Sequence, residues 1–223
     1  MAPPAFSRFP GTKWLRYADP QDAGFSAAGL EEAHVYAQRL RSAAVMVIRG
    51  GAVLCDWGRS ERRFRCHALR ESILHATLGC LAGAGRFDAE KTLAAVGIDE
   101  VPPLSPREGR ACLADLLRAR SGIYRYAAYE AVPPQRPANA EEPGSRFYHS
   151  GWNINALAAI FERLAGEDLF SVFEREIALP LGMQDFRRFD GYYQRNPGRS
   201  LHSAFPCRLS TRDLARLGLL YLR

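Results

Sequence analysis

The segment CHALRESILHATLGCLAGAGRFD, residues 66–88, predicts a buried helix that ends near a glycine and continues into a more polar segment. Its apolar residues fall on two stripes at helical spacing: Leu69, Ile73, Thr77 and Cys80 on one, and Leu74, Leu78 and Leu81 on the other. Two such stripes cover most of a helix's circumference, so we expect the helix to be buried. Glu71 is the exception, because a carboxylate on such a helix needs a partner or a proton.

The composition is that of a folded protein with a substantial core, since 47% of the 223 residues are apolar. The formal net charge is +6, but the basic residues are scattered, which disfavours a nucleic-acid partner. No run of 18 apolar residues predicts a membrane span, and the N-terminal sequence lacks an apolar run suited to a signal peptide. Five widely spaced cysteines argue against a disulfide framework or a zinc ribbon, so we expect a cytoplasmic protein.

The remaining pattern predicts a mixed fold, α/β or α+β, with a helical subdomain. In the first half we expect a helix at 26–42, a hairpin at 43–58 around Gly50-Gly51, and the helix at 66–83. A helix at 107–122, closed by Ser121-Gly122, and an irregular passage at 123–147 follow. In the last part we expect helices at 153–166 and 167–183 and a final helix from Ser210, with Asp213 completing a capping box. We interpret residues 1–223 as a single domain, with the first helix and hairpin at 26–58 and the helical subdomain at 67–223.

Six of these segments, in this order, resemble the β-lactamase-related serine hydrolases: penicillin-binding proteins, class C β-lactamases and their esterase relatives. They are AVMVIRGGAVLCDWG, HALRESILHATLGCLAGAGRFD, LLRARSGIY, NALAAIFERLAG, LPLGMQDFR and LSTRDLARLGLLYLR. The resemblance runs from about Trp14 to the end and implies the penicillin-recognising α/β fold. It also implies further sheet strands and a covering helix beyond Arg223, which this chain lacks.

The resemblance places the family's catalytic motifs on residues that do not fit them. The serine and lysine of S-x-x-K fall on Ala68 and Glu71, and Y-x-N falls on His149, Ser150 and Gly151. A methyl group cannot attack a carbonyl, and a carboxylate cannot replace an ammonium. The third motif, K-T-G or H-x-G, would lie beyond the chain. The resemblance therefore implies a non-acylating pseudoenzyme that binds a small ligand or a partner chain.

Two enzymatic alternatives stay open. Glu71 and His149 could act as an acid/base couple on a small amide, ester or carbonyl substrate, although the same two residues could form a purely structural pair. Ser72, with His75 one turn later, or Ser150 could support residual hydrolysis. The row of His67, Glu71 and His75 does not converge well on one ion, so we expect no metal and no cofactor.

Aromatic residues would line the family's cleft, and among them Tyr124, Tyr148 and Trp152 are candidate ligand contacts. Without later strands, the hairpin at 43–58 would leave a sheet edge and an apolar face uncovered. We therefore expect a homo-oligomer or a second chain that completes the sheet.

Overall fold

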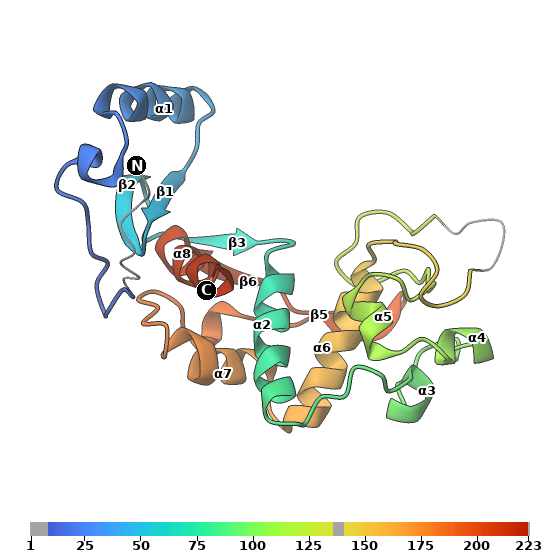
Figure 1. Ribbon diagram of the computed structural model, residues 1–223. Coiled ribbons are helices and arrows are strands. Elements are labelled where there is room, and N and C mark those ends of the chain that lie inside the picture. The colour runs from blue at the N-terminus through green and yellow to red at the C-terminus, as the bar shows by residue number, and fades with distance from the viewer. Residues whose placement is uncertain (1–8, 136–140, 223) are drawn as a thin grey trace. The chain divides into compact units, whose positions relative to one another are not determined.

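The computed structural model describes residues 9–135 and 141–222, and their contacts separate into two compact units (Figure 1). The first unit comprises residues 1–66, 174–190 and 208–223, and the second comprises residues 67–173 and 191–207. The division expected from the sequence, into 26–58 and a helical subdomain at 67–223, stays a prediction. In the structure, residues 174–190 and 208–223 belong to the first unit.

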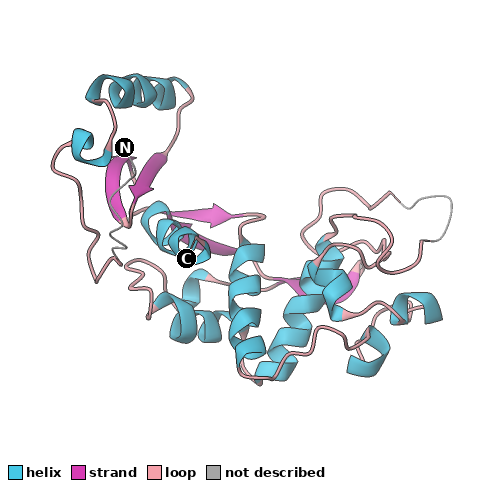
Figure 2. Ribbon diagram, in the orientation of Figure 1, coloured by secondary structure: helices cyan, strands magenta, loops and turns pink. Residues whose placement is uncertain are grey.

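The first unit combines a hairpin with helices (Figure 2). Its elements are η1 (Pro20–Ala23), α1 (Ala27–Arg39), β1 (Ala44–Arg49), β2 (Ala52–Gly58), β3 (Arg63–Cys66), η2 (Glu174–Ala178), η3 (Arg188–Asp190), most of β6 (Cys207–Ser210) and α8 (Thr211–Tyr221). The predicted hairpin is confirmed: β1 and β2 pair antiparallel, and both glycines of its turn, Gly50 and Gly51, have positive φ. Such turns match the twist of the strands they join.

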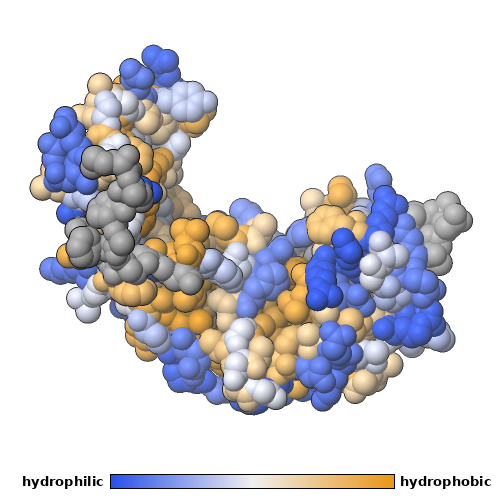
Figure 3. Space-filling model, in the orientation of Figure 1, coloured by the Kyte–Doolittle hydropathy of each residue, from blue (hydrophilic) through white to orange (hydrophobic). Residues whose placement is uncertain are grey.

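Helix α8 begins as predicted, but its capping box is only half formed. Ser210 Oγ accepts the N–H of Asp213 at 3.2 Å. The carboxylate of Asp213, which is fully buried, accepts the backbone N–H groups of residues 184–186 at 2.8, 2.9 and 2.8 Å. Asp213 therefore fixes a loop distant in sequence, which no local pattern could indicate. The surface over α8 includes hydrophobic side chains (Figure 3), and Leu220 is 41% exposed.

The second unit is mainly helical. Its elements are α2 (Arg70–Gly83), α3 (Leu93–Val96), α4 (Pro106–Gly109), α5 (Leu113–Leu117), α6 (Gly151–Ala165), α7 (Leu169–Phe173) and the antiparallel pair β4 (Gln194–Asn196) and β5 (Ser200–Ala204). Helix α2 is buried along most of its length, as predicted. Leu69 was wrongly placed in its apolar stripe: it precedes the helix and is 51% exposed.

The predicted helix at 107–122 was wrong, because the structure forms the two short helices α4 and α5 there. Between them the chain is extended and pairs with an earlier segment. Leu93 N–H donates to Ala111 O at 2.8 Å, and Leu113 N–H donates to Lys91 O at 3.0 Å. A continuous helix would need those same backbone groups. Ser121 does not close a helix, since α5 ends at Leu117.

Helix α6 lies at the centre of the second unit and packs against β5, α5, α2 and α7. Its predicted end at Gly166 is confirmed, with that glycine at φ +74°. The sheets found among the described residues are all two-stranded: β1 with β2, β3 with β6, and β4 with β5. The mixed helix and strand content confirms the predicted fold class. No helix in the described ranges combines the length and apolar character needed to cross a lipid bilayer.

Candidate functional site

The start of α2 presents the two residues that the resemblance placed on S-x-x-K. Residues 67–69 form a turn that leads into the helix, since Arg70 N–H donates to His67 O at 3.2 Å and Glu71 N–H to Ala68 O at 2.9 Å. Ala68 therefore lies in the turn just before α2, and Glu71 lies in the first turn of the helix. A carboxylate there is favoured by the unpaired N–H groups of a helix N-terminus.

Glu71 has the partner that the sequence led us to expect. Nε2 of His149 lies 3.0 Å from Oε1 and 3.2 Å from Oε2 of Glu71. The Glu71 side chain is 19% exposed and that of His149 is 58% exposed. The pair therefore joins a mostly buried carboxylate on α2 to an imidazole that solvent reaches, in the segment just before α6. The catalytic role suggested for these two residues stays a prediction.

His67, in the turn before α2, and His75, within α2, do not join the pair. His67 contacts Tyr129, whose hydroxyl lies 2.9 Å from Nδ1. Nε2 of His75 is buried and makes no hydrogen bond within the described part of the chain. Burial lowers the pKa of His75, although the nearby charge of Glu71 opposes this shift. Nowhere in residues 9–135 and 141–222 do three or more His, Cys, Asp or Glu side chains gather as metal ligands would.

Gly151 is held by a residue that sequence reasoning missed. Its N–H donates to Oε1 of Glu130 at 2.8 Å, and Oε2 of Glu130 accepts the N–H of Ala127 at 3.0 Å. A Cβ on residue 151 would lie only 2.6 Å from Oε1 of Glu130. The carboxylate of Glu130 thus occupies the space that any side chain at position 151 would need. Glu130 lies in the irregular passage before α6, where no periodicity marked it.

The two serines considered as alternative nucleophiles differ in their surroundings. Ser150 is 2% exposed, and its Oγ is buried without a hydrogen bond to any described residue. Ser72 is partly buried in the first turn of α2. A substrate carbonyl could reach Ser150 only if the start of α6 opened, so the structure disfavours direct attack by that hydroxyl.

The aromatic candidates fall into two groups. Tyr124 and Tyr148 are partly exposed, and their ring centroids lie 4.5 Å apart. The Tyr124 hydroxyl donates to Glu141, and burial together with this bond raises the pKa of Tyr124 to about 12. Trp152 is fully buried, and its Nε1–H donates to Glu100 at 2.6 Å. Trp152 therefore belongs to the core, and of these three aromatic candidates Tyr124 and Tyr148 remain possible ligand contacts.

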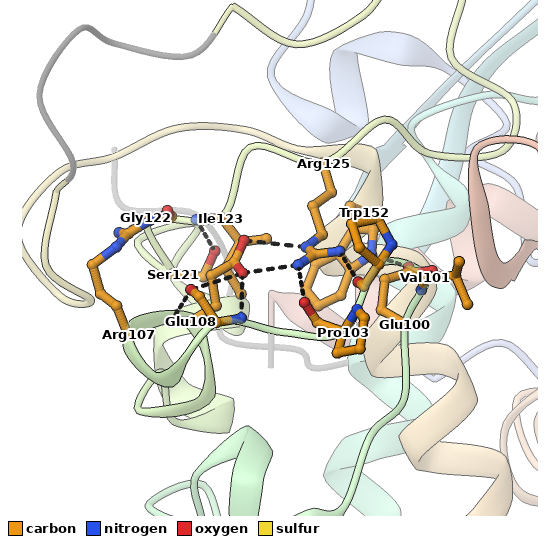
Figure 4. Close-up of polar contacts among 12 residues, drawn as sticks. Glu100, Val101, Pro103, Arg107, Glu108, Ser121, Gly122, Ile123, Arg125 and Trp152 are labelled. Carbon is orange, nitrogen blue, oxygen red and sulfur yellow. Dashed lines mark hydrogen bonds and ion pairs between the residues drawn. The ribbon is translucent and has the colours of Figure 1, made fainter.

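Glu100 is a second buried carboxylate that the sequence pattern did not identify. It accepts hydrogen bonds from Trp152 and from the backbone N–H of Val101 (Figure 4). Ser200 Oγ, at 2.5 Å, and the backbone N–H of Leu201 donate to it as well. Burial alone would raise the pKa of Glu100, but these four hydrogen bonds lower it overall. The carboxylate thus joins α6 to β5 as an ionised, fully engaged group.

Comparison with known proteins identifies the family. The sequence profile described as Beta-lactamase matches residues 27–222. No curated protein sequence matches the chain. Among solved structures, the chain is similar to FmtA from Staphylococcus aureus, with 13% identity over 96% of this chain and 68% of FmtA and a TM-score of 0.65.

Two further structures resemble the chain. An octameric penicillin-binding protein homologue from Pyrococcus abyssi has 18% identity over 89% of this chain and 56% of its own, with a TM-score of 0.64. A beta-lactamase from Mycobacterium bovis has 19% identity over 77% of this chain and 52% of its own, with a TM-score of 0.51. The chain thus spans about half to two thirds of the length of these three structures. Because its family profile covers residues 27–222, the chain belongs to the Beta-lactamase family and has the fold of β-lactamases and penicillin-binding proteins.

Proposed function

We propose that this chain forms no acyl-enzyme and instead binds a small molecule or a partner chain beside Glu71 and His149. The observation that supports the proposal is the 3.0 Å contact between these two side chains. In the register of the family resemblance, their positions belong to the lysine and tyrosine that activate the catalytic serine. A carboxylate and an imidazole paired with each other cannot supply the amine that removes the serine proton.

The proposed nucleophile position agrees with this interpretation. Ala68 lies in the turn that leads into α2, where the register expects the serine, and its methyl group cannot form an ester. The hydroxyl that falls in the other motif, that of Ser150, is buried. Ligand recognition would then rest on the exposed imidazole of His149 and on Tyr148 and Tyr124, the partly exposed aromatic residues that contact each other. Such a mixture of rings and a few polar groups is typical of small-molecule sites.

A second function, acid/base catalysis, is favoured by the orientation of His149. When Nε2–H donates to Glu71, Nδ1 is the basic nitrogen of the neutral ring. The His149 side chain is 58% exposed, so a substrate could approach it, and the carboxylate would hold its tautomer. Proton transfer from a small amide, ester or carbonyl substrate needs no covalent intermediate, so this function is compatible with Ala68.

Intact-protein mass spectrometry tests the first proposal. The protein is incubated with a fluorophosphonate, a penicillin and an activated ester. The variants Ser72→Ala and Ser150→Ala are treated in the same way, and Ser145→Ala, at an exposed loop position, is the control. We expect no adduct with any probe. An adduct that disappears in Ser72→Ala or Ser150→Ala but persists in Ser145→Ala would identify a displaced nucleophile and contradict the proposal.

The substitution Glu71→Gln separates the two functions, because it removes the charge while keeping the shape. A binding protein should retain its ligand, measured by the ligand-induced rise in melting temperature. An acid/base enzyme should lose turnover of ester and amide substrates while retaining binding, because an amide at position 71 no longer fixes the His149 ring as the carboxylate does. Glu32→Gln, at an exposed position of α1, serves as the control. Equal turnover in both variants would contradict the acid/base function.

A further inference from the structure

The second unit contains a pocket that shares neither Glu71 nor His149. The pocket lies beside α4. Its volume of about 400 Å³ is within the range of small-ligand sites. Three arginines and one carboxylate line it: Arg107, Arg125, Arg199 and Glu108. The face around α4 and the loops above it is mainly hydrophilic (Figure 3). Figure 4 shows Arg107, Glu108 and Arg125 as they lie on the wall of this pocket.

The charge of Arg125 is already neutralised. Its Nε and Nη2 donate to the two carboxylate oxygens of Glu108 at 3.1 and 2.9 Å, and its remaining donors reach the carbonyls of Pro102 at 2.6 Å and Pro103 at 2.9 Å. Glu108 also accepts the N–H and O–H of Ser105, both at 2.9 Å. Although burial opposes it, these hydrogen bonds lower the pKa of Glu108 to about 2. Arg125 and Glu108 therefore form a fixed, neutral part of the wall.

Among the described residues, the hydrogen bonds of Arg107 go to neutral acceptors. Its Nη1 donates to Gly122 O at 3.2 Å and to the backbone carbonyl of Glu141. The carboxylate of Glu141 lies near enough to interact electrostatically with Arg107, but its own hydrogen bonds come from Tyr124 and Arg146. Arg146 balances the charge of Glu141, so the charge of Arg107 remains available to a ligand.

Arg199, in the turn between β4 and β5, is also held by contacts to uncharged groups. Its guanidinium carbon lies 4.0 Å from the centroid of the Tyr126 ring, and its Nη1 donates to Glu130 O at 2.5 Å. The carboxylate of Glu130 is engaged with two backbone N–H groups, as described above. Within the described residues, neither Arg199 nor Arg107 lies within 4.0 Å of a carboxylate oxygen. The stacking fixes the plane of Arg199 and leaves most of its donors unused.

The rest of the lining combines the apolar residues Val101, Pro102 and Pro103 with the rings of Tyr124 and Tyr126 and with Ser105. We propose that this pocket binds an organic carboxylate: the acid group pairs with the guanidinium groups of Arg107 and Arg199, and a flat apolar group lies against Tyr126 and the Val101–Pro103 wall. A planar carboxylate matches the fork of a guanidinium better than a spherical anion does. The site goes beyond the proposed function, because its charged residues take no part in the Glu71–His149 pair.

Calorimetric titration with phenylacetate tests the proposal, with its neutral counterpart phenylacetamide and with inorganic phosphate as comparisons. We expect saturable one-site binding of phenylacetate with a dissociation constant on the order of 1 mM, as suits a fragment of this size. Affinity should fall as salt is added, because the attraction is between charges. Phenylacetamide and phosphate should each bind at least five-fold more weakly.

Variants assign the binding to the pocket. Arg199→Gln should weaken phenylacetate binding at least five-fold, and Arg107→Gln should do the same. Arg62→Gln is the matched control, since Arg62 is exposed and stacks on Phe64 at 5.5 Å outside the pocket. Circular dichroism and the melting temperature confirm that each variant is folded, and Arg199→Lys, which keeps the charge, replaces Arg199→Gln if that variant unfolds. Equal binding of phenylacetamide, equal binding of phosphate, or unchanged affinity in both pocket variants would overturn the proposal.

Discussion

Gly151→Ala is a substitution whose effect follows directly from the geometry of the site. A Cβ on residue 151 would lie 2.6 Å from Oε1 of Glu130, closer than Cβ atoms approach other heavy atoms, and 3.0 Å from Cδ. The carboxylate must therefore move. It cannot do so without weakening its hydrogen bonds to the N–H groups of Gly151 and Ala127, now 2.8 and 3.0 Å long.

The expected loss of stability can be estimated from these contacts. A hydrogen bond to a charged group contributes about 1.5–3 kcal/mol, and leaving a buried N–H unpaired adds to the loss. The gain from replacing glycine by alanine in a helix offsets at most about 1 kcal/mol. We therefore expect Gly151→Ala to lower the free energy of unfolding by about 2 kcal/mol. For a chain of this length, that corresponds to a melting temperature lower by about 4–8 °C.

The assay is thermal unfolding followed by circular dichroism, with Gly79→Ala as the matched control. Gly79 lies in α2, and a Cβ there meets no atom within 4 Å. The same substitution should therefore stabilise the protein by about 0.5–1 kcal/mol. In a Glu130→Ala background, Gly151→Ala should cause no further loss, because the clash is gone. A melting temperature of Gly151→Ala equal to that of Gly79→Ala would refute this reasoning.

Other parts of the chain give three further predictions. Asp213→Asn should lower the free energy of unfolding by about 2–4 kcal/mol in urea titrations, because an amide nitrogen would face backbone N–H groups of residues 184–186. The control Asp22→Asn, at an exposed position, should change the free energy little. Equal effects of the two substitutions would contradict the role of Asp213. The pKa of Glu108 is lowered from 4.5 to about 2, so the stability that its carboxylate contributes is present above pH 4.5 and is lost as the pH falls toward 2. Between pH 4.5 and 2, the free energy of unfolding of Glu108→Gln should therefore fall less steeply than that of the parent. Parallel curves of the free energy of unfolding against pH would argue against this. If a second copy or another chain covers the hairpin edge, light scattering at micromolar concentration should give a mass above the 24.8 kDa of one chain, whereas a monomer would contradict the expectation.

The elements that could be predicted from sequence are those fixed by local chemistry. Gly50 and Gly51 adopt positive φ in the hairpin turn, Ser26 accepts the N–H of Gly29 at the start of α1, and Gly166 ends α6. Each depends on backbone geometry within a few residues, which the residue type largely determines. The helix predicted at 107–122 failed for the opposite reason, because a pairing with residues 89–93 competes for its backbone groups.

The candidate site shows the same limit. The contact between Glu71 and His149 was expected because the family resemblance supplied a register for both residues, and no pattern within this chain relates them. Glu130 was missed because it lies in a passage without periodicity, and its carboxylate acts through hydrogen bonds to the backbone N–H groups of Ala127 and Gly151. Trp152 was assigned to a ligand wall because its type suits one, whereas the buried carboxylate of Glu100 holds it in the core.

The residues proposed to replace the family's motifs form two contact pairs, and this arrangement bears on whether acylation could be restored. Changing Glu71 to Lys would remove the acceptor of His149 and place two basic groups together. Changing Gly151 to Asn would drive a side chain into the carboxylate of Glu130. Each of these single changes therefore leaves a polar or charged group without its partner, which is destabilising. In the proposed register, introducing S-x-x-K and Y-x-N would therefore need coordinated change at both pairs as well as at Ala68.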